Sequence, residues 1–236
     1  MPRKKLDESL HQVNNDLIEM GRAVEISIDR AVMSFKTQDL KLAKSVRTYL
    51  DTVDSLEKNI EKETMRILML QHPVAQDFRL LSTALKLITD MQRIADQAYN
   101  IAEITRQLVK SSFITDPQFL LDMAEKSKRM VSRSLDALIN RDEALAQQVI
   151  SDDDEVDALF VSVRNEVVKL IHADTNNGEQ AIDLMMIAKY LERIADHAVN
   201  IASWVIYINT GQHPNLEDPE DLEAPDEPAP LTPSEP

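Results

Sequence analysis

Two copies of one short polar pattern stand one hundred residues apart in this chain. Residues 90–102 read DMQRIADQAYNIA and residues 190–202 read YLERIADHAVNIA, and eight of the eleven positions from 92 to 102 recur from 192 to 202. Packing explains why Ile and Ala are repeated, but it does not explain the repeated Asp and Asn. Carboxylate and amide oxygens one helical turn apart suit hard or borderline cations: Mg²⁺, Mn²⁺, iron or, less readily, Zn²⁺. The pattern therefore predicts a metal site on a helix.

The repeated polar residues form a line of their own on the predicted helix. Glu192, Asp196 and Asn200 step by four residues, and Asp96 and Asn100 take the same places in the first copy. At about 100° per residue, this line lies more than about 90° from the centre of the apolar stripe. We expect it on the surface, where a second helix has to complete the site.

Acidic residues that could complete each site occur on the preceding helix. Within each copy, two of them have i,i+4 spacing: Glu57 with Glu61, and Asp153 with Asp157. Together with Asp54, these residues are the candidate partners. The prediction is that metal binding depends on Glu192, Asp196 and Asn200, with Asp157 or Asp153 opposite.

A metal-free interpretation explains the same charges. A charged stripe is usually a solvated face, and Arg93–Asp96 and Arg193–Asp196 have the spacing of i,i+3 ion pairs. His197 is replaced by Gln97 in the first copy. We therefore predict that His197 is a surface residue and not a ligand.

Composition indicates an all-α protein. Of 236 residues, 43% are hydrophobic and 28% charged, only three are glycine and 4% are aromatic, whereas sheets use glycine in hairpins and aromatics in strands.

The absence of cysteine excludes disulfides and thiolate metal sites. The net charge of −15 makes nucleic acid an improbable partner. No apolar run approaches the roughly 20 residues that cross a bilayer, and no signal peptide is recognisable, so we expect no membrane insertion and a cytoplasmic location.

Breaks in the periodicity predict six long helices, at about 7–36, 39–71, 76–110, 117–139, 142–172 and 179–208. The duplication extends beyond the opening pattern, because residues 37–57 align with residues 140–160. We therefore predict two tandem three-helix bundles, residues 1–113 and 114–211. Residues 212–236 are acidic and rich in proline, and they are predicted to be a disordered tail.

The segment LERIADHAVNIA, residues 191–202, closely resembles the LERIGDHAVNIAE-type signature of the PhoU family. The resemblance covers residues 7–208 and includes both copies of the signature. It implies a helical protein with acidic motifs that can bind iron or other metal clusters on the bundle surface. It further implies a homodimeric regulator, not an enzyme. Such a regulator restrains the phosphate regulon when phosphate is plentiful, through contacts with the phosphate ABC transporter ATPase and a sensor histidine kinase.

The family pattern is incomplete in both halves of this chain. The second signature has Glu192 and Asp196, whereas the first has Gln92 in place of the acid, with Asp96 and Asp90 remaining. On the second helix the motif is present as Glu57 and Glu61 in the first half, but Phe160 replaces its first acid in the second half. Each half is thus predicted to bind metal more weakly than the family pattern implies, or not at all.

Two other functions stay open on the sequence alone. One is a metal-free helical adaptor; an empty first site beside a filled Glu192 site would mark the first half as structural. The other is a carboxylate-bridged metal enzyme, but di-iron bundles use two Glu-x-x-His pairs, and this spacing occurs once in the chain, at Glu8 and His11, outside the repeated polar pattern.

Overall fold

The computed structural model describes residues 2–74, 76–110 and 112–214, and side chains from residue 4 onward within these ranges. Six long α-helices make up almost all of this part, and it contains no strand. They are α1 (Pro2–Thr37), α2 (Leu40–Gln71), α3 (Gln76–Leu108), α4 (Gln118–Asn140), α5 (Glu143–Ala173) and α6 (Gly178–Thr210), with a 3₁₀ turn, η1 (Thr175–Asn177), before α6. The all-α prediction and the six helices are confirmed, and all but the first begin within a residue or so of the expected position.

The helix ends follow from local side-chain chemistry. Asp39 caps α2 by accepting hydrogen bonds from the backbone of Lys41 at 2.7 Å and Leu42 at 3.2 Å. Asp142 caps α5 in the same way, accepting from the Leu145 backbone at 2.9 Å. Gly211 ends α6 with φ of 86°, a left-handed conformation that favours glycine. Asp39 and Asp142 are paired in the sequence repeat, so the duplication includes the start of its middle helix.

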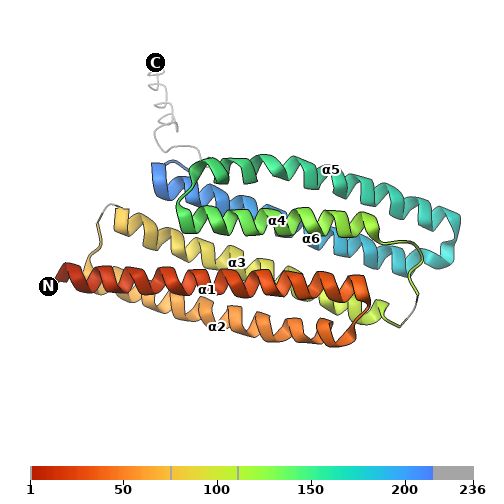
Figure 1. The fold of residues 1–236 in the computed structure, drawn as a ribbon, viewed down its shortest axis with the longest axis horizontal. Helices are drawn as coiled ribbons and strands as arrows, with labels where there is room; N and C mark the ends of the chain where they lie inside the picture. The colour runs from red at the N-terminus through yellow and green to blue at the C-terminus, as the bar shows by residue number, and fades with distance from the viewer. Residues whose placement is uncertain (1, 75, 111, 215–236) are drawn as a thin grey trace, which may run out of the picture.

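The helices form two groups of three that share a central contact. In each group the helices run antiparallel with short connections, α1–α3 in one and α4–α6 in the other, and all six lie roughly along the long axis of the molecule (Figure 1). The third helices, α3 and α6, pack against each other and join the groups. Both helices therefore carry buried apolar residues along much of their length, including Met91 and Ile94 in α3 and Leu191 and Ile194 in α6. The domain limits at 113 and 211 stay a prediction.

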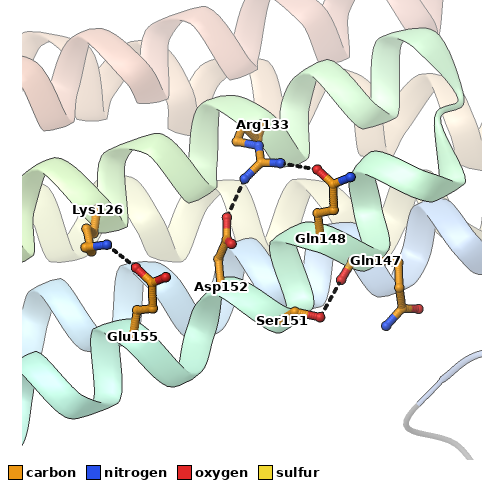
Figure 2. A network of polar contacts seen from close by, with 7 residues as sticks. All are labelled: Lys126, Arg133, Gln147, Gln148, Ser151, Asp152 and Glu155. Atoms are coloured by element: carbon orange, nitrogen blue, oxygen red, sulfur yellow. Dashed lines mark hydrogen bonds and ion pairs between the residues drawn. The ribbon is translucent and has the colours of Figure 1, made fainter.

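Polar contacts join the first and second helices of each group. Figure 2 shows Arg133 of α4 bound to both Asp152 and Gln148 of α5, and Lys126 of α4 bound to Glu155 of α5. In the first group, Arg30 of α1 donates to the Ser45 hydroxyl of α2 at 2.9 Å. These contacts set the register of neighbouring helices, and burial of the apolar stripes provides most of the stability.

The predicted tail lies mostly outside the described residues. Its first residues are within them, and His213 packs edge-on against Trp204 with ring centroids 4.3 Å apart. No helix in the described part of the chain is both long and apolar enough to cross a membrane.

Candidate functional site

The candidate residues gather in two acidic clusters, one in each group of three helices. The first cluster lies between α2 and α3 and the second between α5 and α6. We define the first cluster as Asp54, Glu57, Glu61 and Asp96, and the second as Asp153, Asp157, Glu192 and Asp196. In each group, acids of the second helix therefore lie near acids of the third helix, as the spacing predicted.

Burial and like charge both disfavour ionisation in the second cluster. Burial, followed by the charges of Asp157 and Asp196, raises the pKa of Asp153 to about 6. The pKa of Asp196 is also raised, by burial first and then by the charge of Glu192. Burial raises the pKa of an acid, and nearby like charges raise it further. The carboxylates of α5 and α6 therefore act on one another across the helix contact.

The second cluster nevertheless contains one cation. The Lys189 ammonium binds the Glu192 carboxylate, three residues further along α6. The same ammonium lies 5.5 Å from the centre of the Phe160 ring on α5. Its charge also acts on Asp196, whose pKa it lowers. The suggested Arg193–Asp196 pair is not among the ion pairs of the described residues, and Lys189–Glu192 is the ion pair found at this part of α6.

The first cluster is built differently. Burial, then the charges of Asp54 and Glu61, raises the pKa of Glu57, and the charge of Asp96 on α3 raises it further. Gln92 takes the place of the missing acid and donates a hydrogen bond to Asp96 at 2.9 Å. An amide therefore takes the place of an acid beside Asp96 and hydrogen-bonds to it.

Two of the predicted surface residues contact the other group of helices. Asn200 of α6 donates to the Asp90 carboxylate of α3 at 3.1 Å, and His197 Nδ1 lies 2.9 Å from the same oxygen. Asp90 is only 8% exposed. Asp90 and Asn200 thus join the two groups of helices, and the prediction that His197 is a surface residue is wrong. Asn100, in the first half, is half-buried.

Helical geometry explains why Asn200 leaves the line. Residues four apart differ in direction by about 40°, so a line of three drifts by about 80° around the helix. Glu192 and Asp196 at one end act on residues of α5, while Asn200 at the other end faces α3. The spacing alone could not reveal this, because α6 has helices on both sides.

The donor set does not match a preformed metal centre. Among the residues that the structure describes, no group of three or more His, Asp or Glu side chains is arranged to hold a metal ion. A multinuclear cluster needs several such groups. The metal assignment to these residues therefore stays a prediction from sequence, and the geometry as it stands does not fit it.

Comparison with known proteins decides the family. A PhoU domain model matches residues 17–105 and again residues 120–205, which is one match in each half of the chain. The chain belongs to the PhoU family. The two matches coincide with the internal duplication, so each PhoU domain corresponds to one group of three helices.

Relatives in the PhoU family match over nearly their whole length. A Clostridium acetobutylicum protein, named phosphate-specific transport system accessory protein PhoU homolog, is 31% identical over 92% of this chain and 100% of its own. A protein of the same name from Aquifex aeolicus is 34% identical over 88% of this chain and 94% of its own.

Solved PhoU structures have the same fold. The crystal structure of PhoU from Pseudomonas aeruginosa superposes with a TM-score of 0.85 at 31% identity, covering 87% of this chain and 99% of that one. A phosphate transport system regulatory protein PhoU from Streptococcus pneumoniae gives a TM-score of 0.81 at 22% identity. The resemblance seen in the sequence is thus confirmed for family and fold, and the relatives are named as accessory or regulatory proteins, not as enzymes.

Proposed function

We propose that this protein is a regulatory accessory of phosphate uptake that acts through contacts with other proteins. The observation that carries the proposal is the PhoU domain match in both halves, together with relatives named as accessory proteins of the phosphate-specific transport system. The protein restrains uptake and phosphate-starvation signalling when phosphate is plentiful. Its partners are the ATPase subunit of the phosphate ABC transporter and a sensor histidine kinase, and it works in the cytoplasm as a homodimer.

One corner of the molecule supports a role in protein contacts. Large apolar side chains are exposed around the turn from α2 to α3, namely Met69 (64%), Leu70 (67%), Val74 (69%) and Phe78 (53%). The corresponding turn from α5 to α6 carries the polar residues Asp174, Thr175, Asn176 and Asn177. Contiguous exposed apolar residues on a soluble protein commonly mark an interaction site.

The proposal is tested by capturing the transporter and by measuring the regulatory output. The tagged full-length chain is used in a native lysate from phosphate-rich cells, and transporter and kinase subunits are identified by mass spectrometry. We expect recovery of the transporter ATPase, weakened by the double substitution Met69→Ser and Phe78→Ser. The matched control is Ile182→Ser with Met186→Ser, which removes exposed apolar side chains of α6 (60% and 38% exposed).

The genetic readout is independent of capture. Deletion of the chain should switch on phosphate-starvation genes in phosphate-rich medium, and the wild-type chain should restore repression. Unchanged expression after deletion, together with no transporter or kinase subunit in the captured material, would refute the proposed function.

A further inference from the structure

The second acidic cluster carries a positive charge supplied by the chain itself. Lys189 binds Glu192, whose side chain is only 15% exposed, and its ammonium lies 5.5 Å from the centre of the Phe160 ring. An ammonium held between a carboxylate and an aromatic face is fixed by two attractions that act together. Lys189 is thus anchored within the cluster and is not a freely moving surface lysine.

The first cluster lacks all three of these groups at the corresponding positions. Thr89 takes the place of Lys189, and its hydroxyl donates to the Leu85 carbonyl of its own helix at 3.1 Å. Gln92 takes the place of Glu192, and Glu57 takes the place of Phe160. The half that has the lysine therefore also has the additional acid on the third helix and an aromatic ring in place of the acid on the second helix.

We propose that Lys189 is the resident counter-cation of the second acidic cluster and keeps divalent metal ions out of it. A divalent ion needs several oxygen ligands around one point. The described carboxylates are not so arranged, and Lys189 already binds Glu192. An ion entering next to Asp196 would also meet the ammonium charge, which acts on that carboxylate. The proposal accounts for the disagreement between the acidic pattern and the geometry, and it does not depend on the proposed transport role.

The test is a titration of the full-length protein with Mn²⁺ alone, in which electron paramagnetic resonance counts the free ion. Lys189→Thr introduces the residue found at the corresponding position of the first half. Arg193→Thr is the control, because it removes an equal charge from an exposed position of the same helix. We expect Lys189→Thr to bind Mn²⁺ at least about tenfold more tightly than wild type, the effect of removing one nearby positive charge, and Arg193→Thr to stay within about twofold.

Two further measurements make the result decisive. In the Lys189→Thr background, Asp196→Ala should abolish the gained affinity, which places the ion in this cluster. If Lys189→Thr folds poorly by circular dichroism, Lys189→Met keeps the apolar stem and removes only the charge, with the same expected result. Equal Mn²⁺ affinity in the lysine variants and in Arg193→Thr would overturn the proposal.

The metal content of wild-type protein gives a second way to overturn it. Protein purified without chelator is analysed alongside Asp196→Ala. We expect no stoichiometric metal in either. Metal present in wild type and absent in Asp196→Ala would show that Lys189 does not exclude the ion, and would instead support the metal site predicted from Glu192, Asp196 and Asn200.

Discussion

The two acidic clusters occupy equivalent places in a duplicated chain, yet they limit their repulsion in different ways. Asp96 and Asp196 correspond, and each faces acids from the preceding helix. In the first half, the neighbouring acid is replaced by Gln92, which donates to Asp96. In the second half, that acid is kept as Glu192 and is bound by Lys189. The first half thus has an amide beside the repeated aspartate, and the second half has an acid that is bound by a lysine.

This difference shows that a repeated carboxylate does not need a repeated ligand. Like charges at helical spacing cost only a few tenths of a kcal/mol each, and both the Gln92 amide and the Lys189 ammonium offset part of that cost. The raised pKa values of Glu57 and Asp153 show that neither offset is complete. Substitutions that relieve the remaining repulsion should therefore stabilise the protein.

The largest effect is expected where the halves meet. Asp90→Ala removes the buried carboxylate that both His197 and Asn200 contact, and it should lower the free energy of unfolding by about 2 kcal/mol, because two hydrogen bonds to a charged group are lost. Asp29→Ala is the control: Asp29 also joins the halves, binding Lys128 at 2.6 Å, but its side chain is 48% exposed.

Exposed ion pairs contribute little, so Asp29→Ala should cost less than about 1 kcal/mol. Urea unfolding followed by circular dichroism at pH 7 measures both variants. Equal losses would mean that the Asp90 contacts have no special part in joining the halves.

The next effect concerns pH and the second cluster. Because the pKa of Asp153 in the folded protein, about 6, lies above its ordinary value of 3.8, the folded protein holds this proton more tightly than the unfolded chain does. Stability from this group therefore rises as pH falls from 7 toward 4, and it is lost as pH rises through 6. Since Asp153 is only half-buried, solvent screening limits the contribution to about 1 kcal/mol.

Asp153→Asn should accordingly stabilise the protein by about 1 kcal/mol at pH 7 and flatten the slope of stability between pH 5 and pH 7. Glu57→Gln in the first cluster should act in the same direction, and we expect a smaller gain. Urea midpoints measured at pH 5, 6 and 7 test both variants. If Asp153→Asn leaves the slope of stability against pH unchanged, Asp153 is not the group that titrates in the second cluster.

A smaller effect is expected when the first cluster is given the acid of the second. Gln92→Glu removes the hydrogen bond to Asp96 and adds a like charge four residues away, at a cost of about 0.5 kcal/mol. Adding Thr89→Lys should recover this loss, because it supplies the lysine of the second half. Thr89→Met is the uncharged control, and recovery by Thr89→Met as well would show that charge is not the cause.

Much of the fold could be predicted from the sequence because it depends on periodicity. The short breaks between apolar stripes predicted six helices, and the duplicated RIAD segments predicted that they form two groups. The same pattern predicted that acids of α5 lie near Asp196. Such features repeat every turn, so each residue of a helix adds to the same signal.

Contacts made by single residues were harder to predict. Asn200 was assigned to the metal line, but the drift of that line turns it toward Asp90, and nothing in the sequence shows which helix lies on that side. Lys189 was missed because it lies outside the repeated segment. Its i,i+3 spacing to Glu192 was the available signal, and it would have suggested the ion pair.

The most direct test of the comparison is a double-mutant cycle on Lys189 and Glu192, measured by urea unfolding at pH 7 and low ionic strength. If Lys189 balances the second cluster, Glu192→Gln should destabilise the wild-type protein but stabilise the Lys189→Thr protein, with a coupling energy of about 1 kcal/mol. If Glu192→Gln has the same effect in both backgrounds, Lys189 does not balance the cluster, and the account of the second half is contradicted.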